Sequence, residues 1–250
     1  MFKATNFEYR NRYIIHVILF VLGFMAPWGR LWPRHGQRTW AALTMLPVEH
    51  GGMPILAATL AVTALGLLLV VLGAVLRTWG TAYIGADVVN SRGMHGGAVV
   101  ADGPYRHMRN PLYVGSWLHM LAVALLMEPA GAIFTMVLGG LLQLRLIGSE
   151  EPFLTQKLGA DYTAYCARVP RLLPSIVAKV PAAGHTPHWG YAVLCEIYFI
   201  GVAVSYAVLF ALYGSMLFPV HILLLVQCIL ASLGVSLIGD AFNKKLKAAE

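Results

Sequence analysis

The chain has 250 residues, of which 58% are hydrophobic and only 12% charged, and its mean hydropathy is +0.69. A soluble domain carries about 25% charged residues, so the composition excludes an ordinary soluble protein and predicts an integral membrane protein. The formal net charge of +7 is not accompanied by a basic–aromatic module of the kind that binds nucleic acid. We therefore assign this charge to membrane topology and anionic lipid head groups, and expect no nucleic-acid partner.

Apolar runs recur along the whole chain. A membrane-spanning helix needs about 20 mostly apolar residues, and six runs approach or reach that length: 13–28, 53–76, 112–127, 130–148, 191–213 and 217–239. We therefore predict an all-α integral membrane protein with about six transmembrane helices. Only Glu128-Pro129 separates the third run from the fourth, which predicts a helical hairpin over 112–148.

Polar segments connect these runs. Residues 29–52 are rich in Trp, Pro and His and are predicted to form a loop. The block 77–111 is Gly-rich, and within it Gly97–Val100 is expected to be short and extended. In the block 149–190, apolar residues recur at three- and four-residue spacing from Glu150 to Tyr165, which predicts an amphipathic helix. Pro170 and Pro174 are expected to end that helix.

Six spans place both termini on one side of the membrane. Most Lys and Arg residues fall on that side, whereas the opposite side holds only Arg30, Arg34 and Arg38. The richer side is predicted to be cytoplasmic, so the blocks 77–111 and 149–190 are expected to face the cytoplasm together. We divide the chain into an N-terminal span and loop (1–52), a core (53–190) and a C-terminal two-helix segment with a basic tail (191–250).

The pair Asn110-Pro111 lies where a polar stretch enters the run 112–127. Proline is tolerated in the first turn of a helix, and asparagine before it can cap the free N–H groups. Such a helix start also offers donors and a partial positive charge to an anionic ligand. Tyr105 and Tyr113 supply flat faces for a base or a cationic sulfonium, or serve only as interface anchors. The stretch alone leaves both readings open.

Glu150 and Glu151 follow the run 130–148. At the start of an amphipathic helix, they would stabilise its N-terminus electrostatically. Alternatively, one of them binds a cationic ligand group or ribose hydroxyls. Arg145 precedes them by little more than one helical turn, where it would pair with one carboxylate or reach an anionic substrate.

The stretch GPYRHMRNPLYVG (103–115), the hairpin that follows it, and EEPFLTQKLGADYTAYCARVPRLLP (150–174) together resemble the membrane methyltransferase superfamily. That superfamily includes isoprenylcysteine carboxyl methyltransferases and phospholipid N-methyltransferases. The resemblance covers residues 77–175, and the order and spacing of its motifs make it specific. Asn110 and the EEPF sequence are more like the phospholipid branch, whereas the spacing of Tyr162, Tyr165 and Val169-Pro170 is more like the prenylcysteine branch.

The resemblance implies an S-adenosylmethionine-dependent methyltransferase whose acceptor is a lipid or a small membrane-partitioned molecule. The residues it implies for binding the methyl donor are Gly97, Ala98, Val99, Val100, Tyr105, Asn110, Pro111, Leu112, Tyr113 and Glu150, with Asn90 at the rim. The donor is already activated, so the protein mainly positions the acceptor and excludes water. An amine acceptor must also lose a proton, for which Glu151 and His107 are the candidate bases. Arg145 is the candidate for contact with the acceptor.

The remaining expectations concern location and alternatives. The protein is expected in the bacterial inner membrane, or in the endoplasmic reticulum of a eukaryote. Histidines and cysteines lack metal-ligand spacing, so no metal is expected. A membrane reductase and a non-enzymatic transporter or assembly protein are the alternative functions. The sequence leaves open the chemical nature of the acceptor, the oligomeric state, and whether 191–239 forms part of a lipid tunnel or a dimer contact.

Overall fold

The computed structural model describes residues 3–26, 36–85, 88, 93–94 and 96–211. Within these residues every regular element is a helix, which agrees with the predicted all-α class. In chain order the elements are α1 (Asn6–Arg10), α2 (Arg12–Met25), α3 (Thr39–Gly51), α4 (Ile55–Ile84), the 3-10 helix η2 (Gly103–Arg106), α6 (Pro111–Ala124), α7 (Pro129–Arg168), α8 (Trp189–Cys195) and α9 (Ile197–Ala211).

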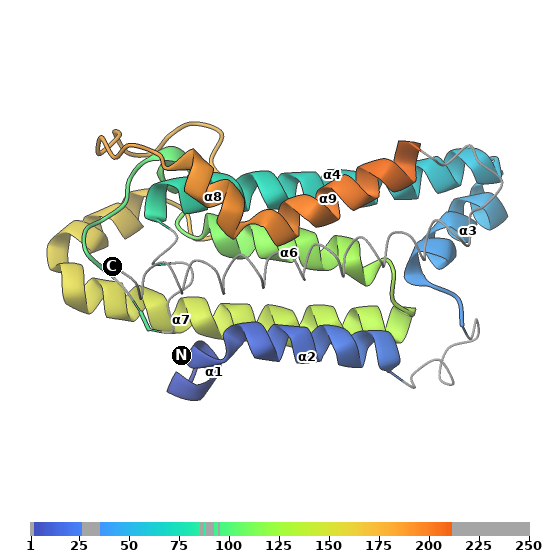
Figure 1. The fold of residues 1–250 in the computed structure, drawn as a ribbon, viewed down its shortest axis with the longest axis horizontal. Coiled ribbons are helices and arrows are strands. Elements are labelled where there is room, and N and C mark those ends of the chain that lie inside the picture. Colours follow the sequence, from blue (N-terminus) through green and yellow to red (C-terminus); the bar gives the residue numbers. More distant parts are fainter. Residues whose placement is uncertain (1–2, 27–35, 86–87, 89–92, 95, 212–250) are drawn as a thin grey trace, which may run out of the picture.

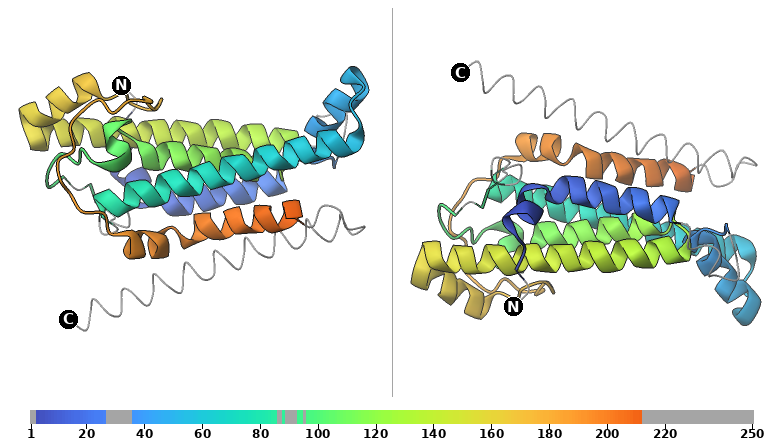
Figure 2. Two further views of the ribbon diagram at one scale, coloured as in Figure 1. Left: turned by 90° about the horizontal axis from the view of Figure 1, so that it is seen from above. Right: turned by 90° about the horizontal axis from the view of Figure 1, so that it is seen from below.

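The long helices lie side by side along one axis (Figure 1). Their contacts run in the order α2, α7, α6, α4 and α9. Figure 1 shows α9 along the top of the bundle and α2 along the bottom, and Figure 2 shows the same bundle from above and from below. Large apolar side chains point outward along this bundle, among them Ile18, Leu68, Val137 and Val204, each about half exposed. An exposed apolar belt of this kind is what a lipid-facing surface requires, and it supports the prediction of a membrane protein.

The structure establishes fewer spans than the six predicted. Among the described residues, two helices, α4 and α7, are long and apolar enough to cross a membrane, and α8 with α9, bent by 73° between them, makes a third if the pair counts as one span. The apolar helices α2 and α6 have only 14 residues each. The predicted run 217–239 lies outside the described residues.

Glycines set the closest helix contacts. Gly73 of α4 faces Gly115 of α6, and a Cβ added at either one would lie 2.8 Å from the backbone oxygen of the other. Gly23 of α2 and Gly131 of α7 approach even more closely, since a Cβ on Gly131 would overlap the backbone of Gly23. Small residues allow this approach in membrane bundles, where van der Waals packing drives helix association.

Helix α7 does not break where the sequence suggested. The predicted amphipathic helix starting at Glu150 is instead the continuation of the preceding span, through Pro152 to Arg168. The interruption comes later, at Gly159, whose φ of 61° and ψ of −130° are accessible to glycine and strained for other residues. Glu150 and Glu151 therefore lie inside a helix, and the proposal that they stabilise a helix N-terminus is wrong. The expected end of the helix, just before Pro170, is confirmed.

The predicted loop 29–52 is also partly wrong, because Thr39–Gly51 forms α3. This helix is held by tertiary contacts: the backbone N–H of Trp40 donates to the Leu125 carbonyl at 2.8 Å, and its ring Nε1 donates to Thr63 of α4 at 3.2 Å. Neither contact leaves a local pattern in the sequence.

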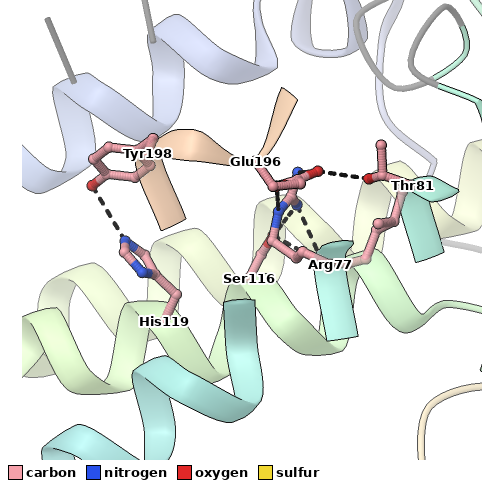
Figure 3. Close-up of polar contacts among 7 residues, drawn as sticks. Arg77, Thr81, Ser116, His119, Glu196 and Tyr198 are labelled. Atoms are coloured by element: carbon pink, nitrogen blue, oxygen red, sulfur yellow. Dashed lines mark hydrogen bonds and ion pairs between the residues drawn. The ribbon is translucent and has the colours of Figure 1, made fainter. Parts of the chain in front are cut away.

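A buried ion pair joins the C-terminal helices to α4 (Figure 3). Arg77 donates from Nε and Nη2 to the carboxylate of Glu196, at 2.6 and 2.9 Å, and Thr81 donates to the same carboxylate at 2.7 Å. Arg77 also donates to Ser116 of α6 at 2.7 Å and stacks 4.1 Å from the centre of the Phe199 ring. Glu196, at the bend between α8 and α9, is fully buried. One side-chain cluster thus fastens three helices together.

This pair gives a stability prediction. Glu196→Ala leaves the Arg77 guanidinium buried without its anion, and such a change costs about 3–5 kcal/mol of unfolding free energy. The double variant Arg77→Met/Glu196→Leu removes both charges and is expected to lose less than the single variant. Thermal unfolding of the detergent-solubilised protein measures both. A double variant that unfolds earlier than Glu196→Ala would contradict this account.

Candidate active site

Polar elements distant in sequence meet at one end of the bundle. The end of α4, η2, the start of α6, the distal part of α7, and the helix α1 all lie at the left of Figure 1. The two polar blocks 77–111 and 149–190 are therefore neighbours, as the topology argument required. The candidate residues can be compared directly within this cluster.

Glu150 is held by two tyrosine hydroxyls. Tyr113 of α6 donates to its Oε1 at 2.9 Å, and Tyr9 of α1 donates to the same oxygen at 2.7 Å. Burial, together with the neighbouring Glu150 charge, raises the pKa of Tyr9, so its hydroxyl stays protonated and remains a donor. Within the part of the chain that the structure describes, Oε2 of Glu150 makes no hydrogen bond, so this oxygen remains available to a ligand.

Glu151 is placed differently, because both of its oxygens are engaged. Arg109 contacts Oε1 at 3.2 Å and Arg171 contacts Oε2 at 2.5 Å. The side-chain amide of Asn110 donates to Oε1 at 3.2 Å and to the Arg171 carbonyl at 3.1 Å. The expected Asn110 cap on α6 is therefore wrong: the amide is used to join α6 to Glu151 and Arg171, and no side chain caps this helix.

Arg145 contacts the N-terminal helix instead of either carboxylate of the Glu150–Glu151 pair. It donates from Nε and Nη2 to Glu8 at 3.0 and 2.8 Å, and these bonds lower the pKa of Glu8 to about 2. The backbone N–H of Ala4 lies 2.7 Å from the Ser149 hydroxyl. Arg145 and Ser149 share one face of α7, so together they dock the chain start beside Glu150.

Residues 170–188, which we call the strap, run antiparallel to residues 103–115, which we call the polar stretch. Its backbone pairs in reverse order with the stretch: Pro170 with Arg109, Ser175 with His107, and Lys179 with Arg106. His107 Nδ1 lies 2.8 Å from the Ser175 carbonyl. Because a carbonyl only accepts, Nδ1 must carry the proton, and in the neutral ring Nε2 keeps its lone pair.

Only some of the other residues predicted to bind the donor are buried near Glu150. Pro111 and Tyr105 are buried at this end, and the Tyr105 hydroxyl has no hydrogen-bond partner among the described residues. Leu112 instead packs against Gly80 in the α4–α6 contact. The segment Gly97–Val100 forms no regular structure: Gly97 and Ala98 are exposed, and Val99 packs against the cluster of Tyr162 and Tyr165. Asn90 lies outside the described residues.

Sequence reasoning missed Tyr9 and Arg12. Arg12, only 8% exposed, lies 4.7 Å from the ring centres of both Tyr9 and Tyr13 and donates to the Tyr9 carbonyl at 3.0 Å. In the sequence it was one of several basic residues flanking an apolar run, and its charge was assigned to topology. No local pattern connects Tyr9 with Glu150, which is 141 positions away.

The residues present suit S-adenosylmethionine. A partly buried carboxylate with one oxygen available matches an α-ammonium group, and the buried Tyr105 hydroxyl still requires a partner. Tyrosine rings suit a sulfonium or an adenine. The described residues contain no group of three His, Cys, Asp or Glu side chains placed to hold a metal.

Residues 61–161 match the model of the phospholipid methyltransferase family. No curated protein and no solved structure matches the chain. The matched segment covers most of α4, the polar stretch, α6 and most of α7, and it agrees with the predicted resemblance to the membrane methyltransferase superfamily. Tyr9, the strap and Glu196 all lie outside the matched segment.

The end of the strap provides a test of pH dependence. Asp102 accepts from the backbone N–H groups of Gly184 and His185, at 3.2 and 3.0 Å, and from His185 Nδ1 at 2.7 Å. Burial alone would raise the pKa of Asp102, but these bonds outweigh burial and lower the pKa below its ordinary value of 3.8. The stabilisation is therefore complete above that ordinary value and is lost as the pH falls through the lower folded-state pKa.

We expect wild type to exceed Asp102→Asn in Tm at about pH 5, with the difference shrinking towards about pH 3. Thermal unfolding in detergent across this range measures it. A Tm difference that stays constant or grows on acidification would show that the Asp102 charge does not stabilise the strap.

Proposed function

We propose that the protein is an S-adenosylmethionine-dependent methyltransferase that acts on a lipid or a membrane-partitioned small acceptor. The observation that carries this proposal is Glu150, a partly buried carboxylate held on one oxygen by Tyr9 and Tyr113, with the other oxygen available. It lies at the polar end of a bundle whose residues 61–161 match a methyltransferase family. In the proposed complex, Glu150 binds the α-ammonium of the donor, and Tyr105, Tyr113 and the start of α6 contact the rest of the molecule.

The bound donor supplies an activated methyl group on a sulfonium. The task left to the protein is to align the acceptor with that methyl group and to exclude water. The strap and α1 would cover the site from two directions, since one is hydrogen-bonded to the polar stretch and the other to α7. A lipid acceptor would arrive sideways from the bilayer, whereas the donor would arrive from the aqueous phase.

An acceptor that has a proton to lose needs a base. Of the two candidates, we assign this role to His107, because the bond from Nδ1 to Ser175 leaves Nε2 as the acceptor nitrogen. Glu151 is held by Arg109, Arg171 and Asn110 and instead joins the strap to α6 and α7. Arg145 is assigned to docking α1 through Glu8 rather than to contact with the acceptor.

We further propose that the site faces the cytoplasm of a multi-pass membrane protein. The excess of Lys and Arg in the segments at this end of the bundle supports that orientation. In a bacterium the membrane would be the inner membrane.

Calorimetric titration with S-adenosylhomocysteine, the product of the donor, tests the proposal directly. Wild type is expected to bind, and Glu150→Ala and Tyr113→Ala are each expected to weaken binding about tenfold or more, because the first removes the carboxylate and the second removes a hydroxyl that holds it. Gln156→Ala, an exposed position on the same helix as Glu150, serves as the matched control. Absence of binding by wild type, or equal binding by all four proteins, would refute the proposed cofactor.

The acceptor is sought separately by incubating the protein with donor labelled in its methyl group and extracted membrane lipids. Label is expected in the lipid fraction with wild type and is expected to be lost with Glu150→Ala. Label that stays with the donor, despite binding in the titration, would exclude the extracted lipids as acceptors.

A further inference from the structure

The N-terminal helix α1 lies against the very turn of α7 that carries Glu150. Three consecutive contacts hold it there: Ala4 to Ser149, Glu8 to Arg145 and Tyr9 to Glu150. A capping box formed by Thr5 and Glu8 starts this short helix, with Thr5 Oγ1 accepting from the Glu8 N–H at 3.2 Å. Glu8 thus both caps α1 and pairs with Arg145, which fixes the rotation of the helix relative to α7.

Tyr9 is the only one of the α1 side chains in the described structure that is buried. Its ring is covered by Arg12, whose guanidinium carbon lies 4.7 Å from the ring centre and whose Nη1 donates to the Tyr9 carbonyl. The ring therefore has a fixed position and its hydroxyl a fixed direction. That direction is towards Oε1 of Glu150.

Two phenol donors on one carboxylate oxygen have a geometric consequence. Both hydroxyls donate to Oε1, so the protein holds the carboxylate through this oxygen, and Oε2 accepts no hydrogen bond from the described residues. Preorganised groups of this kind bind ligands more tightly, because the ligand does not have to order them. Both oxygens of Glu151, by contrast, already have protein partners.

We propose that α1 is part of the donor site and that Tyr9 is a positioning residue, which fixes Glu150 so that Oε2 receives the α-ammonium group of the methyl donor. The inference rests on the proposed function, because it takes S-adenosylmethionine as the donor. It extends the site to a residue outside the matched family segment 61–161. It also predicts that the effect of Tyr9 on ligand affinity depends on the α-amino group of the ligand. A merely structural role for Tyr9 does not predict this dependence.

The test compares two ligands on the full-length protein in detergent. One is S-adenosylhomocysteine, and the other is the same molecule without its α-amino group. Tyr9→Phe removes only the hydroxyl and keeps the ring under Arg12. We expect Tyr9→Phe to weaken binding of S-adenosylhomocysteine about tenfold and to leave binding of the deaminated ligand unchanged. Arg10→Gln, at an exposed position on the same helix, is the control and is expected to bind both ligands as wild type does.

Failure of the inference differs from failure of the proposed function. If wild type binds neither ligand, the proposed cofactor itself is wrong. If wild type binds S-adenosylhomocysteine, but Tyr9→Phe weakens both ligands equally or neither, then Tyr9 does not position Glu150 for the ammonium group and the inference is overturned.

A second variant covers the case in which Tyr9→Phe does not fold. Glu8→Gln removes the ion pair with Arg145 and leaves the Tyr9 hydroxyl in place. A loss confined to S-adenosylhomocysteine supports the docking of α1 as part of the site, and an equal loss for both ligands, or no loss, contradicts it.

Discussion

The length of α7 is the constraint on which the polar end of this protein depends. The part of α7 before its interruption at Gly159 has 30 residues and is about 45 Å long, roughly one and a half times the thickness of the hydrocarbon core. A helix of this length that spans the bilayer must therefore extend beyond it while still attached rigidly to the span. Arg145, Ser149, Glu150 and Glu151 occupy little more than one turn at this transition, and α1, the start of α6 and the strap each bind to that turn.

This arrangement separates two tasks between neighbouring residues. Adjacent positions on a helix point about 100° apart, so Glu150 faces Tyr9 and Tyr113 whereas Glu151 faces Arg109 and Arg171. The first carboxylate has one oxygen without a hydrogen bond from the described residues, and both oxygens of the second are engaged by the protein. Both carboxylates are partly or fully shielded from water, where such differences in hydrogen bonding have their largest effect.

The sequence predicted the elements whose signals are local. Apolar runs located α2, α4, α6 and the first half of α7, and the motif series located Glu150 and Tyr113, which the structure joins at 2.9 Å. It did not predict the continuity of α7 through Pro152, because the apolar run ends at residue 148 and an amphipathic pattern begins at Glu150. The interruption is instead at Gly159, which has a non-helical backbone conformation. The sequence does not show which of its glycines adopts such a conformation.

Contacts between segments that are far apart in the sequence could not be predicted either. Tyr9 reaches Glu150, Asp102 reaches His185, and Arg77 reaches Glu196 across separations of 141, 83 and 119 positions. Each pairs common residue types with no periodic spacing, so one sequence cannot single it out. Asn110 illustrates the same limit: its place before Pro111 suggested a helix cap, but the nearby Glu151 and Arg171 supplied better partners for its amide.

The pair of Arg77 and Glu196 also constrains how the chain is assembled during synthesis. Helix α4 leaves the ribosome more than a hundred residues before α8 and α9, so Arg77 waits for its counter-charge while the intervening helices are inserted. Burial of the Glu196 carboxylate costs several kcal/mol, which is offset only once it meets Arg77. Docking of α8 and α9 onto α4 should therefore be a late step in the assembly of the bundle.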